Sequence, residues 1–457
     1  MKKWIGVGLI TLTASLALTG CLNDPSKNTA GGAAATQPAT AAGSGEADSK
    51  APWIASKNTT RINSSDPYEA AVLTSRTLWM ATSDDNRPGG VVLVNPEEWQ
   101  TALASADLIH HPNNGPVLFV NKDGIPDVTV RELKRLQPAG VESNQGVQAI
   151  LVGNLDPKVE KQAKELGLKT DKIPADNPAA AAKAIDAYYA KVAKENPPSV
   201  IVGSSESKEY TMPAVNWISH MPEPLLYVSK DKVPQETIDA LKTRDGKANI
   251  YLLGPDSVIS AAVEKQLGEY GKVVRIAGKD PVENSIAFAK YKDPATGFGW
   301  GITTPGHNFS LISKENPDLA LASAPFSHLG KHAPLIWTEK DKLPDSVMAY
   351  LMAVQPKYDN SPVEGPFNHA WLTGDERSIS ASGQGEIDSM LEIVSRTGGG
   401  HGGHGGMSGM PAAGDQSGTA GGDAGKNSGT GGTAGTGSGS ASGPGKTDMS
   451  GMSHAGH

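Results

Sequence analysis

Residues 224–234 read Pro-Leu-Leu-Tyr-Val-Ser-Lys-Asp-Lys-Val-Pro, and this pattern occurs three times in the chain. The other copies are Pro-Val-Leu-Phe-Val-Asn-Lys-Asp-Gly-Ile-Pro at 116–126 and Pro-Leu-Ile-Trp-Thr-Glu-Lys-Asp-Lys-Leu-Pro at 334–344, each about 110 residues from the next. Each copy predicts a short buried strand and a Lys-Asp turn. The second proline then starts a helix, where its missing N–H removes no helical bond. The recurrence predicts a threefold repeat.

Each repeat contains further apolar segments that alternate with helical patterns. Helices are expected after the second proline at 127–136, 235–241 and 345–352. Apolar strands that end in glycine are expected at 149–153, 250–254 and 370–374, and one more strand at 91–94, 199–202 and 299–303. Strands that alternate with helices indicate a mainly parallel sheet. We therefore expect an α/β fold of three tandem Rossmann- or Toprim-like repeats, either closed with pseudo-threefold symmetry or arranged in an open row.

The head of each repeat places Asp or Asn before a proline, at Pro67, Pro178 and Pro281. The acidic or amide side chain suits a helix N-cap, and proline suits the first helical position. Glu69 and Glu283 would then occupy the third helical position, as in a capping box. The heads predict helices over 68–79, 179–193 and 282–291.

The repeat pattern resembles the cell wall-binding repeat 2 family of Gram-positive surface proteins. The resemblance covers about residues 58–396, and it rests on the Arg-Ile-Ala-Gly-Lys-Asp head at 275–280, the Lys-Asp turns, and the units at 150–167 and 252–271. It implies small α/β modules, typically three in tandem with pseudo-threefold symmetry. It also implies noncovalent attachment to the anionic glycopolymers of the cell wall.

Six cations recur with the repeat and are the candidate polymer-binding residues. They are Arg61, Lys122, Lys172, Lys230, Arg275 and Lys340. The formal net charge of the chain is -8, so an anionic polymer would have to be attracted by such local cations. The alternative is that each Lys-Asp pair is a solvated turn and that each head cation packs along a helix end.

The N-terminus has the layout of an exported bacterial lipoprotein. Lys2 and Lys3 precede an uncharged apolar run that ends in Leu-Thr-Gly-Cys at 18–21, which resembles a lipobox. Cys21, the only cysteine of the chain, is expected to carry the lipid. The protein would then be held on the extracytoplasmic face of the cell membrane. The expected organisation is a signal peptide (1–20), a flexible stalk (21–57), three repeats (58–170, 171–274 and 275–397) and a disordered tail (398–457).

The glycine-rich tail concentrates histidine and methionine at its two ends. The candidate metal ligands are His401, His404, Met407, Met410, Met449, Met452, His454 and His457. Thioethers suit Cu(I), and imidazoles suit Cu(II), Ni(II) or Zn(II). An extracytoplasmic metal-handling role, copper-type, is therefore the alternative to wall binding, although no cofactor is required. The other interpretation of the tail is a low-complexity linker that tolerates histidine and methionine.

Three histidines of the repeats, His111, His220 and His328, precede the recurring proline at unequal offsets. A shared ligand set is one hypothesis, and ordinary loop histidines are the other. The sequence has no Gly-x-Ser-x-Gly, Walker-type or His-Glu-x-x-His motif, so we expect no enzyme. The acidic balance and the lack of a basic, aromatic-interleaved stripe argue against nucleic-acid binding. The expected partners are the wall glycopolymer and the membrane, with protein partners left open.

Overall fold

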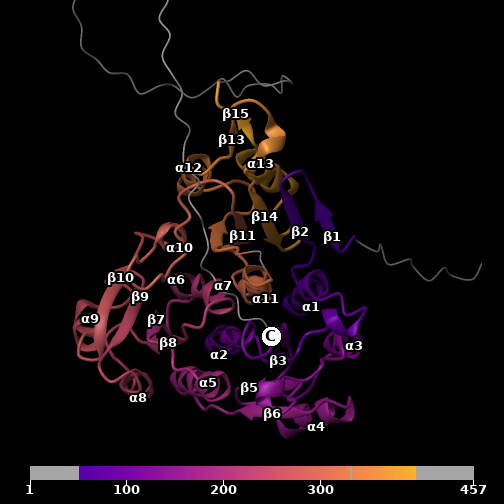
Figure 1. Ribbon diagram of the computed structural model, residues 1–457, viewed down its shortest axis with the longest axis vertical. Helices are drawn as coiled ribbons and strands as arrows, with labels where there is room; N and C mark the ends of the chain where they lie inside the picture. Colours follow the sequence, from indigo (N-terminus) through magenta and orange to yellow (C-terminus); the bar gives the residue numbers. More distant parts are fainter. Residues whose placement is uncertain (1–50, 330–331, 398–457) are drawn as a thin grey trace, which may run out of the picture. The chain divides into compact units, whose positions relative to one another are not determined.

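The computed structural model describes residues 51–329 and 332–397, and all of them belong to one compact unit of the chain. This part contains three main sheets with helices packed against them (Figure 1). Neighbouring strands in these sheets are parallel, except for one antiparallel pair at the edge of the third sheet. The predicted α/β class with repeated, mainly parallel sheets is confirmed.

The first sheet has the strand order β4-β3-β5-β6. Its strands are β3 (Val91–Val94), β4 (Val117–Phe119), β5 (Ala149–Val152) and β6 (Thr170–Ile173). The helices of this part of the chain are α1 (Pro67–Leu78), α2 (Trp99–Ser105), α3 (Asp127–Leu136) and α4 (Pro157–Glu165). Every side chain of β3 is fully buried, which is typical of a parallel sheet covered on both faces.

The second sheet repeats this order as β8-β7-β9-β10. Its strands are β7 (Ser199–Ser204), β8 (Leu225–Val228), β9 (Ala248–Leu253) and β10 (Gly271–Ile276). The helices are α5 (Pro178–Ala193), α6 (Lys208–Thr211), α7 (Ala214–Ile218), α8 (Gln235–Lys242) and α9 (Ala261–Leu267). The two sheets therefore have the same topology.

The third sheet has the order β12-β11-β14-β2-β1. Its strands are β11 (Asn308–Ser313), β12 (Leu335–Thr338), β14 (His369–Thr373), β2 (Thr59–Ile62) and β1 (Trp53–Ala55). The helices are α10 (Pro281–Lys290), α11 (Leu319–Ser323), α12 (Asp345–Ala353) and α13 (Ala381–Leu391). A short parallel pair, β13 (Lys357–Tyr358) and β15 (Val394–Ser395), lies outside this sheet.

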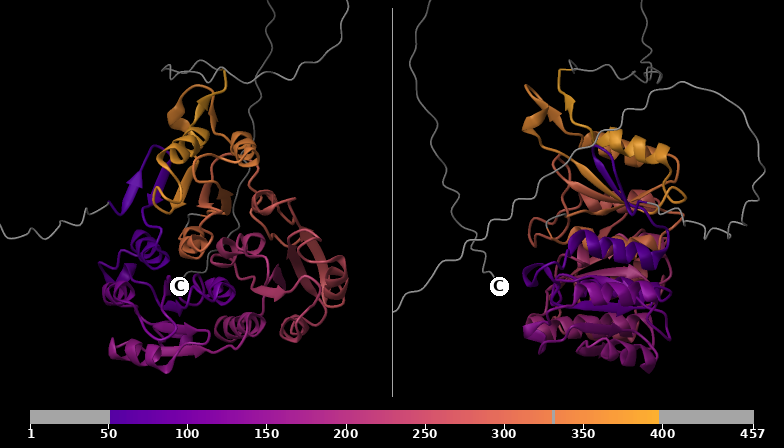
Figure 2. Two further views of the ribbon diagram at one scale, coloured as in Figure 1. Left: turned by 180° about the vertical axis from the view of Figure 1, so that it is seen from behind. Right: turned by 90° about the vertical axis from the view of Figure 1, so that its right-hand side faces the viewer.

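The head strand of each repeat completes the sheet of a different repeat. β6 pairs with β5 of the first sheet, β10 pairs with β9 of the second, and the N-terminal β2 pairs with β14 of the third. Figures 1 and 2 show the indigo N-terminal strands beside the orange third sheet. The three repeats thus form a closed arrangement, which decides between the two arrangements that the sequence left open.

This exchange of head strands shifts the repeat boundaries. The predicted boundaries at 170/171 and 274/275 fall inside β6 and β10, so a unit that is defined by its sheet ends after the head strand. The predicted stalk at 21–57 also extends too far, because β1 lies within it and pairs with β2. The rest of the stalk lies outside the described residues.

The predicted helix starts are confirmed at the three heads. Asp66, Asn177 and Asp280 are N-caps whose side chains accept a hydrogen bond from a backbone N–H of the first turn, and a proline follows each of them. The glycines that end the central strands are also explained: Gly254 and Gly374 have φ angles of 122° and 126°, a region that favours glycine. The chain therefore turns away from the sheet at these positions.

One predicted strand, at 299–303, is wrong. Gly299 and Gly301 have φ angles of 96° and 66°, so the backbone here cannot run as a strand, and the segment is a loop. The strand of the third unit is β11, which begins at Asn308. Its polar Asn308 and Ser310 obscured it in the sequence, although Ser310 is fully buried.

The short helices α2, α7 and α11 contact one another between the three sheets (Figure 1). Each belongs to a different repeat, so this contact joins the units around a common centre. Within the part of the chain that the structure describes, no helix is both long enough and apolar enough to cross a bilayer.

Candidate functional site

The head cations are committed to contacts within the fold. Arg61 lies on β2 and is fully buried; its Nη1 donates to the carbonyl oxygen of Gly374 (2.8 Å) and its Nε to Oε1 of Gln384 (2.9 Å). Burial lowers the pKa of this guanidinium from its usual value. Arg61 therefore holds the exchanged strand against the end of β14 and the helix that follows it.

The other two head cations make related contacts with a carboxylate. Arg275 donates from Nη1 to the carbonyl oxygen of Gly254 (2.8 Å) and from Nη2 to Glu264 (2.7 Å). Lys172 donates to Glu160 at 2.7 Å. Hydrogen bonds from Lys164 and Lys172 lower the pKa of Glu160 to about 2. These cations neutralise internal charges, which leaves them less available to an external polymer.

The lysines of the Lys-Asp turns have a different environment. Their backbone carbonyl oxygens accept hydrogen bonds from the N-cap residues of α4, α9 and α13, at 2.8 Å for Lys122, 2.9 Å for Lys230 and 2.8 Å for Lys340. Lys122 and Lys230 are exposed and Lys340 is half-buried. Among the described residues, their ammonium groups have no hydrogen-bond or ion-pair partner. The backbone of each turn is therefore fixed, while the ammonium group is not engaged by the described residues.

Each turn lysine contacts the same helix as one head cation, which sorts the six candidates into three pairs. Ser380 N donates to the carbonyl oxygen of Lys340, and the carbonyl oxygen of Ser380 accepts from Arg61 at 3.4 Å. In the same way, Lys122 lies with Lys172 around α4, and Lys230 with Arg275 around α9. The turn lysine of each pair follows the carboxyl end of a strand, the edge at which open α/β sheets bind ligands, whereas the head cation lies within a strand. Beside Lys172 this edge is hollowed into a cavity of about 200 Å³.

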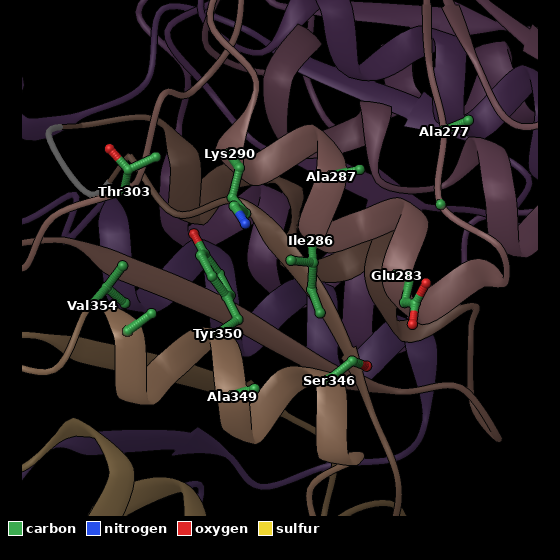
Figure 3. A pocket seen from close by; sticks show the side chains of 12 residues that line it. Ala277, Glu283, Ile286, Ala287, Lys290, Thr303, Ser346, Ala349, Tyr350 and Val354 are labelled. Atoms are coloured by element: carbon green, nitrogen blue, oxygen red, sulfur yellow. The ribbon is translucent and has the colours of Figure 1, made fainter.

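A larger groove lies between α10 and α12, with a volume of about 660 Å³ (Figure 3). The corresponding helix pairs of the other repeats are bridged by ion pairs, from Arg76 to Glu132 (3.0 Å) and from Lys183 to Asp239 (2.8 Å). In the third repeat, the small Ala349 of α12 lines the groove instead (Figure 3). The repeat pattern in the sequence did not indicate this groove, because the groove arises where α12 carries the small Ala349 in place of an ion-pairing side chain.

The groove has a mixed lining. Ile286 and Ala287 make one wall apolar, while Glu283, Lys290 and Ser346 provide polar groups (Figure 3). Tyr350 lies in the floor and donates from its hydroxyl to the carbonyl oxygen of Ile302 at 3.0 Å. An apolar wall with a few polar groups suits a sugar ring, which has both kinds of surface.

Two sets of predicted site residues lie outside the described residues. One is Cys21, the expected lipidation site. The other is the tail set of His401, His404, Met407, Met410, Met449, Met452, His454 and His457. Both remain predictions from the sequence.

The predicted histidine set is partly brought together. His220 and His328 do converge, but the third member is His110 and not His111. The His111 ring stacks on that of His110, with the centroids 4.2 Å apart. The neighbouring position in the sequence therefore supplies the side chain that faces the other two.

The chain is similar to known proteins in part of its sequence and in its fold. No family model matches the chain. A curated relative, "Amidase enhancer" of Bacillus subtilis, is 29% identical over 151 residues, which are 33% of this chain and 20% of that protein. Two solved structures, "Cwp6 from Clostridium difficile" and "Cwp8 from Clostridium difficile", match 73% of this chain, with TM-scores of 0.56 and 0.55 and identities of 18% and 17%.

The chain spans only part of these proteins: it covers 48% of the Cwp6 chain and 51% of the Cwp8 chain. At this level of identity the solved structures establish the fold. The likeness extends over 73% of this chain, so its α/β architecture is one that other proteins share.

Proposed function

We propose that this chain is a surface protein of the cell envelope that binds an anionic cell-wall glycopolymer without enzymatic activity. The observation that carries the proposal is the likeness of its fold, over 73% of its length, to the cell wall proteins Cwp6 and Cwp8. The curated relative is named as an amidase enhancer, which also fits a role at the wall.

The turn lysines are the polymer contacts that the geometry supports best. They place one cation at the edge of each sheet, exposed at Lys122 and Lys230 and half-buried at Lys340, whereas the head cations are occupied by internal partners. Because the chain as a whole carries a formal charge of -8, its attraction to an anionic polymer depends on such local charge. The groove between α10 and α12 would receive an uncharged part of the same polymer.

The membrane attachment is the second part of the proposal. Lipid on Cys21 would hold the protein at the extracytoplasmic face of the membrane, and the preceding sequence supports export. Labelling cells with a radioactive fatty acid tests this attachment. We expect the wild-type protein to take up label and the Cys21→Ser variant to take up none, and equal labelling would contradict the anchor.

Sedimentation with purified cell walls tests the binding itself. The chain from residue 22 to 457 should pellet with the walls at low salt and be released as the salt concentration rises, because the proposed contacts are exposed charges. Walls stripped of their anionic polymers should retain none of it. Failure to sediment with intact walls at low salt would overturn the proposal.

A further inference from the structure

Three histidines from three repeats meet at the centre of the fold. His110, His220 and His328 each follow one of the short helical segments there: the 3-10 turn Ala106–Leu108, helix α7, and the 3-10 turn Ala324–Ser327. The His110 ring centroid is 5.4 Å from that of His220 and 4.6 Å from that of His328. One nitrogen from each ring lies within 4.8 Å of the other two.

Hydrogen bonds fix the tautomers of two of these rings. His110 Nδ1 lies 2.6 Å from the carbonyl oxygen of His220, which can only accept, so this nitrogen carries the proton. His328 Nε2 donates in the same way to Oδ1 of Asn114 at 2.8 Å. The second nitrogen of each ring is then left with a free lone pair. Such N–H bonds to oxygen are the usual support behind a metal-binding histidine.

The third ring presents a buried nitrogen that lacks a partner. Nδ1 of His220 is inaccessible to solvent, and no described residue hydrogen-bonds to it. A buried polar atom in this state is destabilising unless something binds it. Three imidazoles that converge in this way are therefore unlike a set of surface histidines.

The surroundings of two of these rings, His220 and His328, disfavour their charged form. Burial, followed by repulsion from neighbouring histidines, lowers the pKa of His328 to about 3 and that of His220 to about 4. Neutral imidazole is the form that coordinates a metal ion.

We propose that His110, His220 and His328 bind one divalent first-row transition-metal ion such as Zn²⁺. Imidazole nitrogens favour zinc, copper or nickel over magnesium and calcium, which prefer oxygen ligands. A tetrahedral ion about 2.0–2.1 Å from each nitrogen needs the nitrogens to be roughly 3.3 Å apart. Ring rotations that move the nitrogens by about 1 Å would close the site to this geometry.

A neighbouring cavity provides access and a fourth position. It has a volume of about 440 Å³ and is lined by His220, His332, Trp217 and Trp300, among others. The His332 ring centroid lies 4.2 Å from that of His220, so this ring can complete the coordination, or water can do so. Because the three ligands come from three repeats, the bound ion would also link the repeats at their centre.

Zinc titration of the full chain tests this site. The protein is purified in detergent with Cys21→Ser, and with His401, His404, His454 and His457 replaced by Ala, so that neither the thiol nor the tail imidazoles compete. Calorimetry should show one equivalent of Zn²⁺ bound, and the double substitution His110→Gln/His220→Gln should abolish that equivalent. The matched control is His369→Gln, a histidine beside Trp371 at a centroid distance of 5.2 Å, which should keep it.

An unchanged equivalent in the double variant would overturn the site, as would no uptake by the parent protein. Circular dichroism checks that the variant is folded. If it is not folded, Co²⁺ added to the parent decides: visible absorption bands of a nitrogen-coordinated ion should saturate at one equivalent, and their absence would refute the proposal. Wall sedimentation is a separate assay, so failure of either proposal is seen independently of the other.

Discussion

The head cations and the turn lysines both recur three times, yet the fold uses them in opposite ways. Arg61 is fully buried and bonded to Gly374 and Gln384, whereas Lys122 carries its charge into solvent. The difference follows from the strand exchange: a head residue lies on a strand that is inserted into another unit, and a turn residue lies at a sheet edge. A repeated position in the sequence therefore indicates a repeated place in the fold, but it does not indicate a repeated function.

The largest effect is expected from Arg61→Ala. The change leaves the carbonyl oxygen of Gly374 and the amide of Gln384 without their buried donor, which should lower the free energy of unfolding by about 3 kcal/mol. Urea denaturation followed by tryptophan fluorescence measures this loss. Arg131→Ala, at an exposed position on α3, is the control and should change stability little. A loss for Arg61→Ala no larger than that of the control would show that this buried head cation does not stabilise the fold.

A smaller loss is expected from Arg275→Ala. Arg275 is less buried than Arg61 but contacts both Glu264 and the carbonyl oxygen of Gly254. Removing these charge-assisted bonds should lower the free energy of unfolding by about 2 kcal/mol. Arg275→Lys keeps the charge but cannot make both bonds with the same planar group, so it should fall between wild type and Ala. Equal stability of all three proteins in urea would contradict this role.

The third head cation should have the smallest effect on stability. Lys172 is largely exposed, so Lys172→Ala should change the free energy of unfolding by less than about 1 kcal/mol. The substitution should still alter the pH dependence of the free energy of unfolding. The pKa of Glu160 is lowered to about 2, so its stabilising contribution is present above its unfolded pKa near 4.5 and is lost as the pH falls toward 2.

Urea midpoints measured from pH 6 to pH 2 therefore distinguish the Lys172→Ala variant from wild type. Lys172→Ala should lose less stability over this range than wild type, because one of the two lysines that lower the pKa of Glu160 is gone. Identical pH profiles would show that Lys172 does not act on Glu160.

Local features of the fold could be predicted from the sequence, but the pairing of its parts could not. Asp66 before Pro67 and Asp280 before Pro281 specify helix starts through their own side chains, so the helices at the heads were placed within one residue. The partner of β2 is β14, about 310 residues away, and nothing in the apolar pattern of a strand names its neighbour.

The candidate sites show the same limit. Proximity of the three histidines depends on how three units close, so the sequence could suggest a shared set but could not choose His110 over His111. The burial of Arg61 was likewise hidden, because the sequence pattern did not indicate the strand β2 at the head and arginine is usually exposed. The Lys-Asp turns were easier to place, since turn chemistry is local.

The most direct measurement is sedimentation of wall fragments with a variant in which all three turn lysines, Lys122, Lys230 and Lys340, are changed to Ala. The matched control replaces three exposed lysines that lie outside the turns, one from each repeat: Lys134, Lys247 and Lys357. Both variants lose the same charge, and both should unfold within about 0.5 kcal/mol of wild type.

If the wall polymer contacts the turns, the first variant should bind walls at least about tenfold more weakly at low salt. This corresponds to a difference of about 1.4 kcal/mol in the free energy of binding. The control variant should bind nearly as well as wild type. Equal binding by the two variants would contradict the account, because the turn lysines would then contribute no more than any other surface charge.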